Sequence, residues 1–193
     1  MGERRTPSEK ELRAFSDHLL YEIEMFSATV GVLAVVIEME VSHTRTTLRN
    51  ALMESWALHV RNLLSFLYDR RAGKGDAVAA DFVGSGWAAK RGAKPEVLAL
   101  AHAKASKEMA HMSWLRSVLT DDQREWHPEP IIVALGNALH EFLDSVPEAL
   151  VVGRFHERAR LSLPPRNVPL SIHGLQIVSG ATQSLSAFHP HDR

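Results

Sequence analysis

Residues 47–70 read TLRNALMESWALHVRNLLSFLYDR, and this stretch decides the fold. When it is placed on a helix at about 100° per residue, its apolar side chains fill an arc of roughly 180°. Most amphipathic surface helices carry a narrower apolar stripe, so we expect this helix to pack against two or three neighbours at the centre of the molecule. The apolar arc contains Leu52, Met53, Trp56, Ala57, Val60, Leu63, Leu64, Phe66 and Leu67.

A line of polar residues, Ser55, His59 and Asn62, follows one edge of this arc. Such a line can bind a polar ligand or position a general base. It can equally form a buried hydrogen-bond network, because polar groups at a seam between helices must be satisfied. We favour the network and keep His59 and Asn62 as candidate binding residues.

Glu54 and Arg61 lie on the polar side of the same helix. They are two turns apart, too far for a direct ion pair within the helix. We therefore expect each side chain to meet a partner on a neighbouring helix, with Lys107 as the candidate for Glu54. Both residues are candidate binding residues.

The composition is that of a soluble globular protein. The chain has 193 residues, of which 45% are hydrophobic and 23% charged, so we expect one domain with a tail. Its net charge of −1 excludes a global basic field, although a local basic patch is compatible with it. The absence of cysteine excludes disulfides, thiol catalysis and thiolate metal sites.

The N-terminal segment carries charges of both signs and no apolar core, unlike a secretory signal. The longest uncharged apolar stretch runs from Met25 to Ile37, 13 residues, whereas a membrane span needs about 20. The sequence therefore predicts a cytoplasmic protein that does not associate with a membrane.

The first helix has a clear start. Pro7, Ser8 and Glu11 form a capping-box signature, and apolar residues then recur at helical spacing. The β-branched residues within 31–37 would also suit a strand, but we prefer a helix that continues to about Glu40. A threonine in the segment that follows is expected to cap the central helix.

Two further helices are predicted after the central one, over residues 95–119 and 131–146, followed by a shorter helical piece to about residue 158. Beyond it the chain becomes rich in proline and serine, with a weak hairpin signal about Gly174. The predicted fold is all-α: a four-helix bundle in residues 1–158 and an irregular tail in residues 159–193.

Glu108 and His111 form a Glu-x-x-His pair of the kind found in di-iron bundles. No second such pair occurs in the last long helix, where His140 and Glu141 are adjacent. We favour an ion pair at the edge of the core and predict no cofactor. A metal or small-ligand site in the core, built with Glu54 and His59, is kept as an alternative.

Several segments together resemble a widespread family of small bacterial helical proteins of unknown function. That family is similar in turn to the HEPN superfamily of helical bundles, many of which are RNases in toxin–antitoxin and phage-defence systems. The resemblance covers roughly residues 15–147 and implies a HEPN-like bundle that forms a homodimer. It rests on residues 18–25 (HLLYEIEM), 50–66, Asp81-Phe82, 107–111 (KEMAH) and Trp126.

HEPN nucleases carry an Arg-x(4–6)-His motif, and two chains pair to build one active site. The equivalent here ends in His111, but Ser106 stands where the arginine would be. Lys107 supplies a charge nearby without the planar two-pronged donor of arginine. Segments 13–18 and 166–173 match the bare pattern as well, as expected by chance among 11 histidines and many arginines.

Three functions follow as hypotheses. In the first, which we prefer, the protein binds RNA or cleaves it without a metal, with His111 as acid or base and Lys107 or Arg61 steadying the phosphate. In the second it is a non-catalytic dimeric interaction module with a degenerate site, and in the third a metal or small-ligand protein. An antitoxin or another protein is a further expected partner.

The far half of the first helix gives an independent reason to expect a homodimer. Met25, Leu33, Val36 and Ile37 lie where a central second helix would leave them few partners within the chain. An apolar helix end normally becomes buried, in a second subunit if its own core does not reach it. We therefore expect the segment Val30–Ile37 in or beside a symmetric interface.

Overall fold

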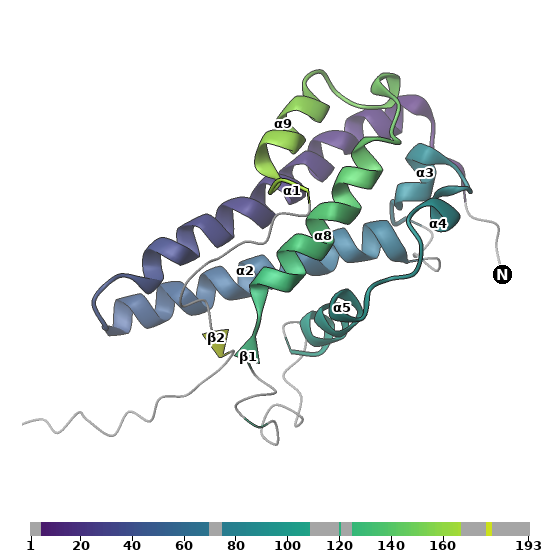
Figure 1. Cartoon of the computed structure of the whole chain (residues 1–193). Coiled ribbons are helices and arrows are strands. Elements are labelled where there is room, and N and C mark those ends of the chain that lie inside the picture. The colour runs from purple at the N-terminus through teal and green to yellow at the C-terminus, as the bar shows by residue number, and fades with distance from the viewer. Residues whose placement is uncertain (1–4, 70–74, 109–119, 121–124, 167–176, 179–193) are drawn as a thin grey trace, which may run out of the picture.

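The computed structural model describes residues 5–69, 75–108, 120, 125–166 and 177–178. These residues are mostly helical with two short strands, which confirms the all-α prediction (Figure 1). In chain order the elements are α1 (Glu9–Ile37), α2 (His43–Tyr68), α3 (Ala79–Val83), α4 (Trp87–Lys90), α5 (Glu96–Glu108), β1 (Glu125–Trp126), α8 (Pro128–Leu143), the 3-10 turn η1 (Glu148–Leu150), α9 (Phe155–Ser162) and β2 (Ile177–Val178).

Helix α1 begins with the predicted capping box. The Glu11 backbone N–H donates to Ser8 Oγ over 3.4 Å, and the Ser8 N–H donates to Glu11 Oε2 over 2.8 Å. The helix continues through the β-branched residues to Ile37, so segment 31–37 does not form a strand. It ends three residues before the predicted Glu40.

Helix α2 begins at His43, earlier than the predicted start at Thr47. Its cap is Ser42, whose Oγ accepts from the Arg45 N–H over 3.1 Å, so the prediction of a threonine cap was wrong. Arg45 Nη2 also donates to the Ile37 carbonyl over 2.5 Å. That bond closes the short turn that joins α1 and α2 into a hairpin (Figure 1).

Helix α2 is the centre of the bundle, as predicted. It packs against α1, α3, α5 and α8, which cross it at different points (Figure 1). Trp56 is fully buried, with its ring stacked on Phe26 at 6.4 Å and edge-on to Trp126 at 5.7 Å. The other residues predicted inside, Val60, Leu63 and Leu67, are also buried.

The segment between α2 and α5 covers one end of the core. Trp87, in α4, donates from Nε1 to the Leu67 carbonyl over 2.9 Å, near the end of α2. The Phe82 ring of α3 packs edge-on to Phe66 and Phe142 at 5.9 and 6.0 Å. These contacts place the turn at residues 91–94 beside the last residues of α2, which positions the pocket described below.

The later helices follow the predicted order with shifted ends. Helix α5 agrees with the first part of the prediction for 95–119, whose remainder lies outside the described residues. Helix α8 starts at Pro128, three residues before the predicted Ile131, because proline is compatible with a helical first turn. It ends at Leu143, before Pro147.

Helix α9 runs through the predicted domain boundary at residue 158. Ala159 and Leu163 are buried, and the Pro164 carbonyl lies 2.9 Å from His140 Nε2. Residues up to 166 therefore pack on the bundle. Strand β2 pairs antiparallel with β1, Ile177 opposite Trp126; the other residues of the weakly predicted hairpin about Gly174 lie outside the described part.

Helix α1 has two apolar faces. The inward face, which packs on α2 and α9, includes the buried Leu33 and Val36, and Ile37 packs partly buried against the same core. The prediction that these three residues have few partners within the chain was therefore wrong. By length and composition alone α1 is apolar enough to cross a membrane. Its outward face carries Tyr21, Met25, Ala28, Val32 and Val35, of which Tyr21, Val32 and Val35 are 54%, 50% and 67% exposed.

Candidate functional site

A polar network joins α1 to α2 at the predicted edge. His59 Nδ1 lies 2.8 Å from Glu22 Oε2, and Asn62 Nδ2 donates to the same oxygen over 3.3 Å. His59 is 5% exposed, and the Tyr21 ring packs edge-on to it at 5.8 Å. Since a carboxylate only accepts hydrogen bonds, His59 carries its proton on Nδ1. The network interpretation of His59 and Asn62 is confirmed, with Glu22 as their common acceptor.

Glu54 lies on the solvent side of α2, because Met53 and Trp56 occupy the inward face. It is exposed and forms no ion pair with any residue that the structure describes, so the expected cationic partner is not found there. Lys107 is exposed in the last turn of α5 and likewise forms no ion pair within the described part. The predicted pair of Glu54 and Lys107 is therefore not formed.

Arg61 is half-buried on α2, and after burial and Lys94 its charge makes a smaller contribution to the lowered pKa of His102 in α5. Its Nε is buried and has no hydrogen-bond partner among the described residues. A buried donor of this kind is uncommon in folded proteins and is often satisfied by water or a ligand. Arg61 thus keeps hydrogen-bonding capacity that the bundle does not use.

Of the residues predicted to form a HEPN-type site, the structure describes only some. His111 lies outside the described residues, as does the side chain of Glu108, whereas Ser106 is half-buried in α5. Arg13 and His18, from one of the chance matches, are both exposed on α1. Among the residues that the structure describes, no three His, Asp or Glu side chains gather closely enough to hold a metal ion.

In the second chance match, residues 166–173, the arginine makes structural contacts within the bundle. Arg166 Nη2 donates to the His140 carbonyl over 3.0 Å and bonds to Asp144. Its hydrogen bond, followed by that of Arg160, holds the pKa of Asp144 below its ordinary value. His173, the other end of this match, lies outside the described residues.

A second polar cluster, which sequence reasoning missed, lies between α2 and α5. His102 Nε2 is 3.0 Å from Ser65 Oγ, and its Nδ1 is 3.0 Å from Lys94 Nζ. A charged lysine only donates, so His102 Nδ1 accepts and Nε2 carries the proton toward Ser65. In a serine hydrolase the base accepts from the serine hydroxyl. The hydrogen bond between His102 and Ser65 therefore runs in the opposite direction to the one that activates a nucleophilic serine.

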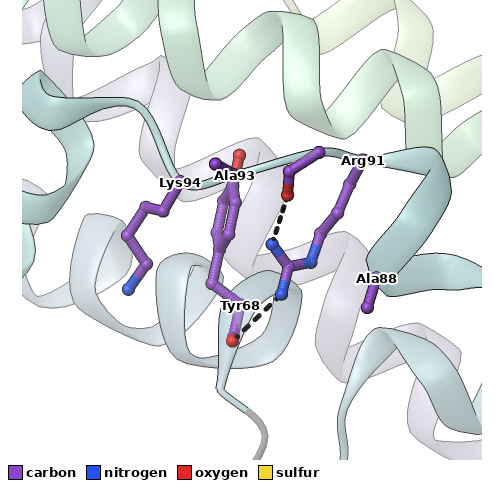
Figure 2. A pocket seen from close by; sticks show the side chains of 6 residues that line it. Tyr68, Ala88, Arg91, Ala93 and Lys94 are labelled. Atoms are coloured by element: carbon purple, nitrogen blue, oxygen red, sulfur yellow. Dashed lines mark hydrogen bonds between the residues drawn. The ribbon is translucent and has the colours of Figure 1, made fainter.

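Beside this cluster the Tyr68 ring lies between two cations, as Figure 2 shows. Arg91 Cζ is 4.4 Å from the ring centroid and Lys94 Nζ is 5.3 Å from it. Arg91 also donates to the Tyr68 carbonyl over 3.3 Å and to the Gly92 carbonyl over 2.8 Å. Together with Ala88 and Ala93, these residues line a pocket of about 460 Å³, within the size range of small-molecule sites.

The pKa values in this cluster reflect burial and positive charge. Burial raises the pKa of Tyr68 and lowers that of Lys94, with Asp69 acting in the opposite direction on Lys94. Burial is also the main cause that lowers the pKa of His102, followed by Lys94. His102 is therefore neutral near pH 7, which agrees with the tautomer inferred from the geometry.

The sequence offers little signal for this cluster. Ser65 and His102 are 37 residues apart and Lys94 and His102 are eight apart, so no local motif joins them. The only local cue is the pair of cations in Arg91-Gly-Ala-Lys94, immediately before the proline that precedes α5.

Comparison with known proteins gives no relative: no family model matches the chain, and neither a curated protein nor a solved structure is significantly similar to it.

Proposed function

We propose that this protein is a HEPN-like, cytoplasmic interaction module that works as a homodimer, with the outward face of α1 as its interface. One observation carries the proposal: apolar residues at alternating spacings of four and three residues face away from the bundle on α1, and all of them except the half-buried Met25 are exposed. They are Tyr21, Met25, Ala28, Val32 and Val35.

This spacing is that of a helical seam. Alternating steps of three and four place apolar side chains along one line of a helix, where a second helix packs into the gaps between them. Val32 and Val35 are at least half exposed, and burying a valine or leucine side chain is worth about 1.5–3 kcal/mol when it is complete. Gly31, on the same side, has open space around it, which lets another backbone approach closely.

A second copy of the chain suits this face better than a lipid surface does. A twofold axis would place each apolar line against its own copy, so no other complementary surface is required. Membrane-surface helices usually flank their apolar face with Lys and Arg. Between residues 14 and 37, α1 contains no Lys or Arg and carries Asp17, Glu22 and Glu24. This part of α1 itself therefore offers anionic lipids no cation to bind.

The test is the mass in solution. Light scattering at micromolar concentration is expected to give twice the chain mass of 21.5 kDa. Val35→Asp should shift the mass to that of the monomer, because a charge in an apolar seam is unpaired. The matched control is Leu161→Asp on α9, which is 78% exposed and outside the seam and should remain dimeric.

Two results would contradict the proposal. One is a monomeric wild-type protein over this concentration range. The other is flotation of the wild-type protein, but not of Val35→Asp, with vesicles that contain anionic lipid, which would assign the same face to a membrane.

RNA-directed activity is the second candidate function, supported by the buried Arg61 Nε that has no partner in the described part of the chain. Helices α2 and α5 pack together, so Arg61 and Lys107 lie on adjoining elements. In this proposal His111 acts as acid or base. A ribose 2′-OH attacks the adjacent phosphorus, loses its proton to a base, and the 5′ oxygen leaves with a proton from an acid.

An RNA-cleavage assay in EDTA tests this second function. Wild-type protein should yield 2′,3′-cyclic phosphate ends, and His111→Ala should abolish them, while Lys90→Ala, a change at an exposed lysine of α4, should leave them. Binding without cleavage would indicate a degenerate site. Such a site is compatible with regulation by an antitoxin or another protein partner.

A further inference from the structure

The apolar seam on α1 continues past the end of the helix into the turn before α2. Met39 follows Val35 by four residues, which extends the alternation of three and four, and it is 41% exposed. Its backbone N–H donates to the Val36 carbonyl over 3.2 Å, so the chain still follows a tight helical turn at this residue. The seam therefore runs from Tyr21 to the tip of the α1–α2 hairpin, which lies at the opposite end of the molecule from α3 and α4 (Figure 1).

The six seam positions are symmetric about residue 30. Residues 28 and 32 lie two positions from it, residues 25 and 35 lie five, and residues 21 and 39 lie nine. In a twofold contact, residue i meets residue j of the partner and residue j meets residue i. Two copies of this seam can therefore pack antiparallel about an axis beside residue 30, with every seam residue of each copy covered by the other.

Side-chain size favours this antiparallel arrangement over a parallel one. In a parallel pair each residue faces its own copy, so two Tyr21 rings would hold the helices apart where two Ala28 methyl groups, two turns away, would leave a gap. In the antiparallel pair Tyr21 faces the flexible side chain of the partner's Met39, and Ala28 faces the partner's Val32. The layers are then more even in volume, as a close-packed interface requires.

The middle of the seam also allows a close approach. Gly31 is exposed beside the expected axis, and a Cβ built on it would have nothing within 4 Å. Ala28, the smallest side chain of the seam, is exposed nearby. Small residues at this point let the two backbones come together where the helices cross.

Charge at the helix ends favours the same orientation. The C-terminal end of α1 carries the negative end of the helix macrodipole, and the exposed Glu38 and Glu40 follow it with no basic residue in the last turn. A parallel pair would place two such ends side by side. In the antiparallel pair each end lies beside the N-terminal half of the partner helix, where Arg158 binds Glu24 through two hydrogen bonds of 3.0 and 2.9 Å in each copy.

We propose that the partner copy of α1 runs antiparallel, with the twofold axis beside residue 30 and the hairpin turn of each copy docked against Tyr21 of the other. This inference rests on the proposed dimer and adds its orientation and register. Tyr21 packs edge-on to His59 at 5.8 Å. The partner's Met39 therefore covers the exposed side of the ring that encloses the network of His59 and Glu22.

The experiment is disulfide cross-linking, which suits a chain that contains no cysteine of its own. Met25→Cys and Val35→Cys chains are co-expressed with different affinity tags, purified through both tags and oxidised mildly. A disulfide requires Cα atoms about 4.4–6.8 Å apart. The mixed pair meets this condition in the antiparallel register, whereas the ten residues between the two positions separate them by about 15 Å in a parallel pair. We expect a high yield of the mixed disulfide and little disulfide in either variant alone.

Met25→Cys co-expressed with Leu161→Cys is the matched control, because Leu161 is 78% exposed on α9 and lies outside the seam. The seam pair should give at least about tenfold more disulfide than this control, since thiols in one complex react at a high effective concentration. Equal yields would overturn the proposal.

Three further outcomes would also overturn it. Disulfide formation by Val35→Cys alone, without the mixed product, would show a parallel pair. A high yield for Met25→Cys with Ala28→Cys would show a different register, and a dimer in which no seam pair reacts would place the contact elsewhere. Light scattering on the wild-type protein separates the two proposals: a monomer overturns both, whereas a dimer with the parallel pattern overturns only the orientation.

Discussion

Replacement of Trp56 by alanine tests whether α2 is the centre of the fold. The side chain is fully buried, and a buried tryptophan removes about 200 Å² from water, worth about 5 kcal/mol at about 25 cal/mol per Å². The alanine methyl group retains a small part of this, and relaxation of the cavity recovers some more. The change also removes two aromatic pairs, with Phe26 and with Trp126. We expect a loss of about 3–5 kcal/mol in the free energy of unfolding.

A second substitution sharpens the test. Trp56 Nε1 is buried and has no hydrogen-bond acceptor within the described part of the chain. Trp56→Phe keeps an aromatic ring and removes this unsatisfied donor, whose burial costs about 1–3 kcal/mol. The loss in the free energy of unfolding should therefore be smaller for Trp56→Phe than for Trp56→Ala, by about 2 kcal/mol or more.

The assay is urea unfolding followed by far-ultraviolet circular dichroism, at one protein concentration because unfolding of a dimer depends on concentration. Leu58→Ala, at a 45% exposed position on the same helix, is the control and should cost less than about 0.5 kcal/mol. A loss below about 1 kcal/mol for Trp56→Ala, or one no larger than that of Leu58→Ala, would refute the central position of α2.

Two further predictions concern polar contacts. His59→Ala should lower the free energy of unfolding by about 1–3 kcal/mol, because it removes a buried partner of Glu22. A double-mutant cycle with Glu22→Ala should give a coupling energy of about 1 kcal/mol. If the two effects instead add to within about 0.3 kcal/mol, the network is contradicted. The Ser8 N–H and hydroxyl, followed by Arg5, lower the pKa of Glu11 from 4.5 to about 2. A depressed carboxyl pKa stabilises the fold above the unfolded value, so this contribution is complete above pH 4.5 and disappears as the pH falls toward 2. Urea midpoints should therefore fall less steeply over this range in Glu11→Gln, and equal slopes would exclude a contribution from the cap.

Much of the fold was predictable because it depends on local patterns. The apolar arc of residues 47–70 identified α2 and its buried residues, since a helix fixes which side chains share a face. The Ser8–Glu11 box marked the start of α1 because both partners are three residues apart. The helix ends were less predictable. Ser42 and several threonines near it were all suitable caps; in the structure Ser42 caps α2, and Arg45 bonds to the Ile37 carbonyl across the same turn.

The candidate sites were predictable only in part. The edge formed by His59 and Asn62 follows from helical spacing, and its interpretation as a hydrogen-bond network was correct. The prediction that Glu54 meets a cation on a neighbouring helix was wrong for the described residues, where Glu54 faces solvent. The position of a neighbouring helix determines whether a polar side chain faces a seam or solvent.

The sequence by itself determined that the chain is helical, which residues of its central helix are buried and where the first helix begins, because all three depend on residues within one or two turns of each other. Only the tertiary structure decided that Glu22 faces His59, that Lys94 and Ser65 meet on His102, and that α1 keeps an uncovered apolar face. These pairings join residues of different elements. The crossing of the helices sets their distances, and the packing of large side chains across the whole core sets that crossing.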